Sequence, residues 1–324
     1  MRKLKLLTLS TVIAMGFSTV VNAATEIRAA FNQSDKHPQY RALQEFGEQL
    51  TEATQGRYKL NIFPNELLGD QRASLELVQN GAIQMAVVAN PLVENYNTNF
   101  SVIGLPYIYS GYDHQQQVFT SGALDSLFKE TSRLGFEVVA AYTGGARSMY
   151  NKAGPITSMT DMQGKKIRVM QSDTMLKTLS CMGGQGVPMG QGEVYSAIQQ
   201  GVLDGAENSE ITYYDLKQYE VAPFYSATRH LMVPDLVVAS SMFLDSMSKD
   251  DRATFERLIK DSTNNQFDLW KNQIEVSKQA AISEGAQFNE VDIEPFRQAC
   301  IPLQEQLIKS PVQKELYNKI VSLQ

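Results

Sequence analysis

Apolar positions in the first half of the chain alternate between a two-residue period, typical of strands, and a helical period. Short apolar runs predict strands over residues 26–32, 58–63, 83–88 and 136–142. Helices are expected from Pro38 to a stop at Gly56, and from a cap at Asp70 to the Asn80-Gly81 pair. Two short helices follow the turn-rich segment 105–107. This order predicts an α/β fold with a mostly parallel sheet covered on both faces.

The second half repeats this alternation. Strands are expected over residues 166–170 and 203–208, and helices over 173–181 and from Gly192 to Gly201. Residues 249–284 form a long helical pattern without Pro or Gly, which corresponds to about 50 Å at ~1.5 Å per residue. Because roughly 300 residues exceed one comfortable core, two lobes are expected, and this helix is long enough to brace both.

The N-terminal segment predicts export. Basic Arg2, Lys3 and Lys5 precede an apolar run over residues 6–21 and a small-residue cleavage pattern that ends at Ala23. Residues 1–23 are therefore interpreted as a signal peptide; the alternative is a membrane anchor, although polar residues interrupt the run. Its removal leaves 26 basic against 35 acidic residues, a formal charge of −9. Such an acidic mature chain argues against nucleic acid or an anionic membrane as a partner.

Little in the sequence indicates a catalytic or metal centre. The histidines, His37, His114 and His230, lack ligand spacing, so no metal is predicted. No nucleophile–base spacing or phosphate loop is found, so neither a cofactor nor enzymatic activity is predicted. Cys181 and Cys300 could form a disulfide in an oxidising compartment, or they could remain free or buried thiols.

One residue stands out against its surroundings. Arg168 lies inside the short apolar strand at residues 167–170, with no acidic residue close to it in sequence. Because a buried charge must be paired, we expect an anionic partner, and a ligand carboxylate would supply it.

Several motifs together resemble the substrate-binding proteins of TRAP transporters, the DctP-like group. They are GDQRASLELVQNGAIQMAV (69–87), LPYIYSGYDH (105–114), GARSMYN (145–151), GKKIRVM (164–170), PMGQGEVYSAIQQGVLDGAEN (188–208) and YEVAPFYSATRH (219–230). The resemblance covers nearly the whole mature chain. It implies a two-lobed periplasmic binding protein fold that closes about a hinge, captures an organic anion and delivers it to a sodium-coupled TRAP permease.

The resemblance also implies roles for individual residues. Arg168 corresponds to the arginine that forms the central salt bridge with the ligand carboxylate. Arg147 is expected to make a second contact to the carboxylate or a neighbouring hydroxyl; an ion pair that braces the lobes is the alternative. Asn208 is expected to hydrogen-bond the same end of the ligand, or else to cap a turn. Glu207 is interpreted as structural support, as a partner for an arginine.

Further polar residues fall at strand ends or helix starts, where ligands of open α/β sheets bind. Each of these candidates could instead be a capping or solvated residue; they are Asn32, Gln33, His37, Gln71, Asn90, Gln171 and Asp235. The resemblance places an aromatic residue where this chain has Gln191, and a polar side chain there favours a hydroxylated ligand.

The expected function is therefore a periplasmic solute receptor whose leading ligand is a hexuronate such as glucuronate or galacturonate. The alternatives are a C4-dicarboxylate or another carboxylate, or a receptor that feeds a signalling partner. The proposed lobe boundaries are 24–145 plus 234–272 for lobe I and 146–233 plus 273–324 for lobe II. After removal of the signal peptide, we expect no direct membrane insertion.

Overall fold

The computed structural model describes residues 24–324, so the predicted signal peptide lies outside the described residues. The strands are β1 (Thr25–Ala30), β2 (Tyr58–Phe63), β3 (Met85–Ala89), β4 (Phe136–Asn151), β5 (Lys166–Val169), β6 (Gln185–Pro188), β7 (Gly205–Asn208), β8 (Phe224–Ser240) and β9 (Gln287–Glu290). The α-helices are α1 (Pro38–Ala53), α2 (Gln71–Gln79), α3 (Asn90–Val93), α4 (Tyr112–Thr120), α5 (Asp125–Lys129), α6 (Asp173–Cys181), α7 (Val194–Gln199), α8 (Glu210–Asp215), α9 (Ser241–Ser246), α10 (Lys249–Ser283), α11 (Glu294–Leu307) and α12 (Pro311–Val321). The 3-10 helices are η1 (Thr98–Gly104), η2 (Glu130–Leu134), η3 (Met159–Met162), η4 (Gln191–Glu193) and η5 (Gln218–Glu220).

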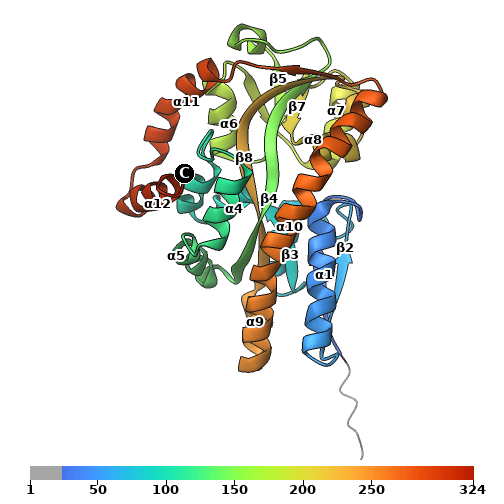
Figure 1. Cartoon of the computed structure of the whole chain (residues 1–324), viewed down its shortest axis with the longest axis vertical. Coiled ribbons are helices and arrows are strands. Elements are labelled where there is room, and N and C mark those ends of the chain that lie inside the picture. Colours follow the sequence, from blue (N-terminus) through green and yellow to red (C-terminus); the bar gives the residue numbers. More distant parts are fainter. Residues whose placement is uncertain (1–23) are drawn as a thin grey trace, which may run out of the picture.

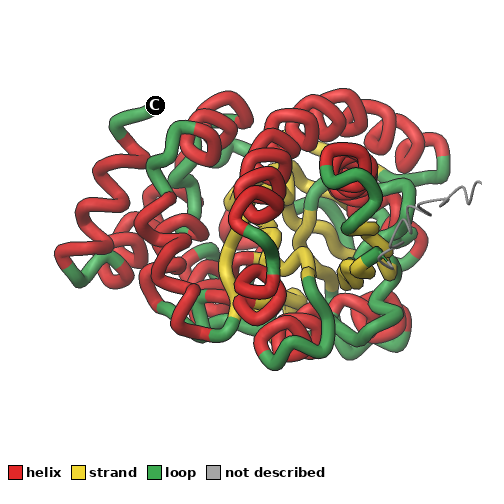
Figure 2. The backbone as a smooth tube through the Cα atoms, turned by 90° about the horizontal axis from the view of Figure 1, so that it is seen from below, coloured by secondary structure: helices red, strands yellow, loops and turns green. Residues whose placement is uncertain are grey.

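Two long antiparallel strands, β4 and β8, run through the middle of the molecule and join its two lobes (Figure 1). The sheet has the order β2-β1-β3-β8-β4-β7-β5-β6, and β9 pairs with β8. We call the part around β1, β2 and β3 the first lobe, and the part around β5, β6 and β7 the second lobe. Helices surround the strands, which lie in the interior (Figure 2).

The sheet is mixed rather than mostly parallel. Within each lobe the neighbouring strands β1/β2, β1/β3, β5/β6 and β5/β7 are parallel, as expected, but β3/β8, β4/β8 and β4/β7 are antiparallel. The sequence pattern missed β8 because it contains Pro234, which cannot donate to a ladder, and Arg229, which has a positive φ of 41°. β4 also continues nine residues beyond the predicted end at Tyr142.

Strand alternation divides the first-lobe core into two layers. Ile27, Ala29 and Phe31 pack with residues of α1 and α10 on one face, while Ala30 and Val88 pack with η1 and α4 on the other. In the second lobe, Ile167 and Val169 of β5 face α6 and α11. The predicted cap at Asp70 is confirmed, since its side chain accepts a hydrogen bond from the Ala73 amide, 2.8 Å away.

Helix α10 confirms the predicted brace. It begins at Lys249 after the Ser248 cap and ends at Ser283, and it packs against α1 and α4 as well as β4 and α8. Figure 1 shows it passing alongside both lobes. Among residues 24–324, no helix has the length and apolar character that crossing a bilayer requires.

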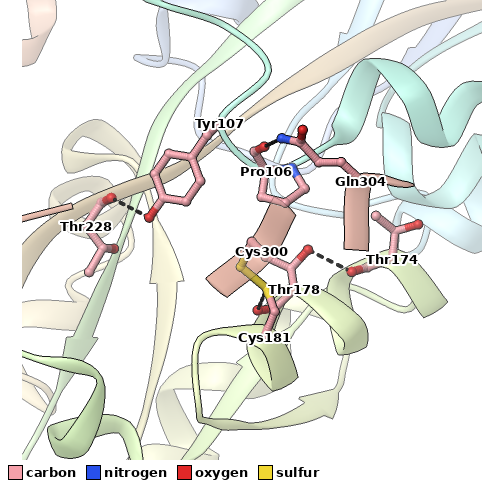
Figure 3. Close-up of a disulfide and its surroundings, with 8 residues drawn as sticks. All are labelled: Pro106, Tyr107, Thr174, Thr178, Cys181, Thr228, Cys300 and Gln304. Atoms are coloured by element: carbon pink, nitrogen blue, oxygen red, sulfur yellow. Dashed lines mark hydrogen bonds between the residues drawn. A yellow bond between two sulfur atoms is a disulfide. The ribbon is translucent and has the colours of Figure 1, made fainter. Parts of the chain in front are cut away.

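The C-terminal segment contacts both lobes. Cys181 of α6 and Cys300 of α11 form a disulfide with their Cα atoms 5.2 Å apart (Figure 3). Beyond it, α12 packs on η1, and its Leu316 and Ile320 belong to a first-lobe core. The division into lobes by residue number stays a proposal, and these contacts favour assigning α12 to the first lobe.

Candidate functional site

Two adjoining cavities lie between the lobes. The first is lined by Asn32, Gln33, His37, Gln71, Ala89, Gly144, Arg147, Met170, Gln191, Asn208, Thr212, Asp235 and Trp270. The second is lined by Glu66, Asp70, Gln71, Arg72, Leu92, Arg168, Met170, Gln171, Met189, Gly190 and Gln191. Gln71, Met170 and Gln191 line both, so the cavities are neighbours. Their walls come from both lobes and from the central strands.

Arg168 of β5 is a buried cation without an acidic partner. Its side chain donates from Nε to the Met189 carbonyl at 2.9 Å and from NH1 to Gln191 Oε1 at 3.2 Å. The residue is only 4% exposed, and among residues 24–324 no carboxylate oxygen lies within 4.0 Å of its guanidinium nitrogens. Burial lowers the pKa of Arg168 to about 10, despite the opposing charge of Glu207. The remaining guanidinium donors are available to an anion in the cavity.

Arg147 of β4 has its acidic partner within the protein. Its Nε and NH2 donate to the two carboxylate oxygens of Glu207 at 2.6 and 2.8 Å, and NH2 also donates to the Glu207 carbonyl at 2.8 Å. NH1 donates to Asn208 Oδ1 at 2.8 Å. Because β4 and β7 are paired at Ser148–Asn208, the sheet itself holds these groups together.

Glu207 is ionised although it is fully buried. Burial raises the pKa of Glu207, but the charge and hydrogen bonds of Arg147 outweigh this effect and lower it to about 2. His230 Nε2 lies 3.6 Å from Glu207 Oε2, beyond hydrogen-bond distance. Burial lowers the pKa of His230, so this imidazole is neutral at physiological pH.

Asn208 presents its amide to the first cavity in a fixed orientation. Its Oδ1 accepts hydrogen bonds from Arg147 NH1 and from the Ser209 amide at 2.9 Å. This fixes the oxygen toward the protein and leaves the Nδ2 donors without a partner among the described residues. The group can therefore donate to a ligand oxygen.

The first-lobe wall is polar but carries little positive charge. His37 caps α1, accepting at Nδ1 from the Gln39 amide, and burial lowers its pKa to about 3, so it is neutral. Its Nε2 and the Oε1 of Gln33 are buried without a partner in the described part of the chain. Gln71 Oε1 instead accepts from the Ala89 amide at 2.6 Å, which turns its NH2 group outward.

Asp235 of β8 adds an acidic group to the same wall. Its Oδ2 accepts from Gln39 Nε2 at 2.6 Å, and burial raises the pKa of its carboxyl. Together with Asn32, which also lines the first cavity, these side chains offer donors and acceptors of the kind that sugar hydroxyls need.

Besides Arg168, two predicted site residues do not line the first cavity. Asn90 lines neither cavity and is completely buried, donating from Nδ2 to the Phe100 carbonyl at 3.0 Å, so its position favours a structural role. Gln171 lines only the second cavity, and its backbone carbonyl accepts a hydrogen bond from Asn95 Nδ2 of the other lobe at 3.0 Å.

Sequence reasoning missed several cavity residues. Trp270 was expected only as part of the long helix, yet it lines the first cavity and packs edge-on against His37 at 5.4 Å between ring centroids. Thr212 and Met170 also line this cavity. Gln191, by contrast, was singled out in the sequence as a polar residue where the resemblance places an aromatic one; it lines both cavities and carries a buried Nε2 without a partner among the described residues.

No group of three or more His, Cys, Asp or Glu side chains capable of holding a metal ion is found within residues 24–324.

Comparison with known families gives one match over most of the chain. Residues 29–310 match the family model described as DctP, bacterial extracellular solute-binding protein, family 7.

Solved structures of similar fold carry sugar acids. The chain is 34% identical to a TRAP periplasmic solute-binding protein of Anaerococcus prevotii with bound glucuronate, with a TM-score of 0.89 over 92% of this chain and 98% of the other. It is 29% identical to a TRAP periplasmic solute-binding protein of Bradyrhizobium sp. in complex with galacturonate, with a TM-score of 0.90 over 92% and 100%. It is also 27% identical to the C4-dicarboxylate-binding periplasmic protein DctP of Vibrio cholerae, over 78% of this chain and 76% of that protein.

Proposed function

Because this chain belongs to the DctP family of TRAP solute-binding proteins, we propose that it is a periplasmic receptor that captures a hexuronate, glucuronate or galacturonate. It would deliver this ligand to the membrane subunits of a TRAP permease, the partner of this receptor family. The family consists of binding proteins, and we propose that this member likewise has no catalytic activity of its own.

The observation that carries the proposal is the unpaired guanidinium of Arg168. A buried cation without an acid is unfavourable, and an Arg fork matches a carboxylate in a bidentate geometry. A ligand carboxylate bound there would supply the missing negative charge. Asn208 Nδ2 would donate to the same end of the ligand, while Arg147, occupied by Glu207, would mainly hold Asn208 in place.

The opposite end of the ligand distinguishes a hexuronate from a C4-dicarboxylate. A second carboxylate would need a second cation, yet the basic residue of the first cavity, Arg147, already neutralises Glu207. The first-lobe wall instead offers neutral His37 and Gln33 and the acidic Asp235. Hydroxyl groups can donate to Asp235 and pair with the amides, whereas a second carboxylate would be repelled. This favours a monocarboxylated, hydroxylated ligand.

Capture would proceed in two steps. The carboxylate docks on Arg168 in the second lobe, and closure about the central strands then brings the first-lobe wall onto the hydroxyls and excludes water. We propose that cleavage near Ala23 releases the mature protein into the periplasm.

A thermal-shift screen of the mature protein tests this function. The ligands tested are D-glucuronate, D-galacturonate, succinate and malate. Any copurified ligand is first removed by denaturation and dialysis. A ligand at a hundredfold excess over its Kd stabilises the folded state by about 2.7 kcal/mol, which is a clear upward shift. Shifts with the uronates alone are expected. A shift with succinate or malate and none with any uronate would overturn the hexuronate assignment in favour of a dicarboxylate receptor.

A further inference from the structure

Three carboxylates lie where the two lobes meet and lack a basic partner. They are Glu66 and Glu94 of the first lobe and Asp215 of the second. Within residues 24–324, none of them has a Lys, Arg or His nitrogen within 4.0 Å. Each meets a neutral group of the opposite lobe: Glu66 meets Gly192, Glu94 meets the Thr174 amide and Asp215 meets Ser34.

Glu94 follows α3 and reaches the start of α6 in the second lobe. Its Oε1 accepts from the Thr174 amide at 3.4 Å, next to the Ser172 cap. Its Oε2 is buried without a hydrogen-bond partner of good geometry in the described chain, and the residue is only 6% exposed. The neighbouring charged group is Asp173, of like sign. The adjacent Asn95–Gln171 hydrogen bond fixes the same contact.

Glu66 reaches across the cleft from the loop after β2. The chain there is held in a left-handed conformation, with φ of 55° at Asn65 and 57° at Glu66. Its Oε2 lies so close to Gly192 of the second lobe that a Cβ on this glycine would stand 2.9 Å away. Its Oε1 is buried without a partner among the described residues. The charged groups that act on it are Asp70 and Glu193, of like sign, and the cation Arg168; Arg72 lines the same cavity.

Asp215 is the third carboxylate and belongs to the second lobe. It lies at the end of α8 and faces Ser34 and Lys36, which belong to the first-lobe loop between β1 and α1. Burial raises the pKa of Asp215 to about 6, although the Lys36 charge and the Ser34 hydroxyl oppose the shift.

All three carboxylates become harder to ionise when the lobes are together. Burial raises the pKa of Glu66 and of Glu94 as well, because removing a carboxylate from water disfavours its charged form. In separated lobes these side chains would face water and titrate in their ordinary range. The protein with closed lobes therefore binds protons more tightly than the protein with open lobes.

We propose that closure of the lobes over the ligand takes up protons at Glu66, Glu94 and Asp215, which together form a pH-sensitive interlobe latch. The inference rests on the proposed function, since it requires lobes that open to admit an anion. The direction follows from linkage: where the closed state binds more protons, lowering the pH favours it and tightens ligand binding. A carboxylate on Arg168 strengthens the effect at Glu66, because it neutralises a cation that favours Glu66 ionisation.

The other titratable groups of the cleft do not produce this dependence between pH 5.5 and 8. Burial lowers the pKa of His37 and His230, so exposure of either imidazole on opening would make closure release protons, which is the opposite dependence. His37 packs against Phe31 and Trp270, and Glu207 stays ionised beside Arg147. Asp235 is held by Gln39 of its own lobe, so closure leaves that partner unchanged.

Calorimetric titration of the full mature protein with D-glucuronate, and separately with D-galacturonate, tests the latch. Experiments at pH 5.5 to 8 in buffers of different ionisation enthalpy count the protons taken up on binding. For each proton fully linked, the Kd changes by about tenfold per pH unit, so we expect binding at pH 5.5 to be at least about threefold tighter than at pH 7.5. Proton uptake should increase as the pH is lowered from 8 to 5.5.

The matched variant replaces the latch by isosteric amides, as Glu66→Gln, Glu94→Gln and Asp215→Asn together. Because an amide imitates the protonated acid, this variant should bind the uronate without proton uptake, with a pH-independent Kd and slower dissociation at pH 7.5. The control carries Glu48→Gln, Glu305→Gln and Asp268→Asn, all at exposed positions, and should keep the wild-type dependence. The three single amide variants repeat the test if the triple variant does not fold.

The outcomes separate the two proposals. Uronate binding without proton uptake, or equal uptake by the latch variant and the wild type, would overturn the latch and leave the receptor function standing. Failure of both uronates to bind at any pH would overturn the hexuronate assignment and the latch with it.

Discussion

Replacing Glu207 by glutamine tests the buried ion pair that orients the carboxylate-binding end of the site. The change leaves the Arg147 guanidinium buried without its counter-charge, and one of the two oxygens that accept from it becomes an NH2 donor. Breaking a buried pair in this way costs about 3–5 kcal/mol. We expect the urea midpoint of Glu207→Gln to fall accordingly.

The pH dependence of the protein's stability gives a second value for the free energy of the Arg147–Glu207 interaction. The pKa of Glu207 falls from 4.5 to about 2 in the folded protein, because Arg147 outweighs the opposing effect of burial. At ~1.36 kcal/mol per pH unit, this shift corresponds to about 3 kcal/mol. For a lowered carboxyl pKa, the stabilisation is complete above about pH 4.5 and is lost as the pH falls toward 2. The free energy of unfolding of Glu207→Gln should therefore lack this decrease of about 3 kcal/mol between about pH 4.5 and 2.

The measurement is urea unfolding at several pH values, followed by fluorescence of Trp270, the one tryptophan of the chain. The matched control is Glu290→Gln, which removes an exposed ion pair with Arg229, 2.7 Å apart; such pairs contribute at most about 1 kcal/mol. If Glu207→Gln costs no more than Glu290→Gln, or keeps the wild-type pH dependence, the assigned role of the buried pair is wrong.

Three further predictions concern single features of the structure. Cys181→Ala with Cys300→Ala opens a loop of 119 residues, for which chain entropy predicts a loss of up to about 5 kcal/mol; a thermal midpoint that does not change would contradict this. Asn90→Ala should cost about 1–3 kcal/mol by leaving the Phe100 carbonyl unpaired, with an unchanged uronate Kd; weaker binding without destabilisation would restore Asn90 as a ligand contact. Gln191→Leu should weaken uronate binding by about tenfold in calorimetry, equivalent to ~1.4 kcal/mol, and unchanged affinity would remove it from the site.

The sequence predicted those parts of the fold that depend on local patterns. Helix α10 was identified because its apolar positions recur without Pro or Gly, and the Asp70 cap because an Asp at that position has one common local role. Strand β8 was missed because Pro234 and the left-handed Arg229 interrupt its pattern. Its pairing with β4, more than 80 residues earlier for most of its length, is decided by burial in the assembled sheet.

The site was predictable to a similar extent. Arg168 could be singled out because a charge inside an apolar strand conflicts with its neighbours. The pairing of Arg147 within the protein could not be derived from the local sequence pattern, since its partners Glu207 and Asn208 lie 60 and 61 residues away. The same holds for Glu66, Glu94 and Asp215, whose environment exists only where the lobes touch. The buried position of Asn90, by contrast, shows how a polar residue after a strand can serve the fold instead.

Calorimetric titration of D-glucuronate and D-galacturonate into wild-type protein and Arg168→Ala tests the central claim most directly. Losing the buried cation at a desolvated charge pair costs about 2 kcal/mol or more, so the variant should bind at least about thirtyfold more weakly, with its fold retained by circular dichroism. The control Arg297→Ala, which removes an exposed ion pair with Glu294, should bind as the wild type does. Full uronate affinity in a folded Arg168→Ala variant would contradict the assignment of Arg168 as the carboxylate-binding residue.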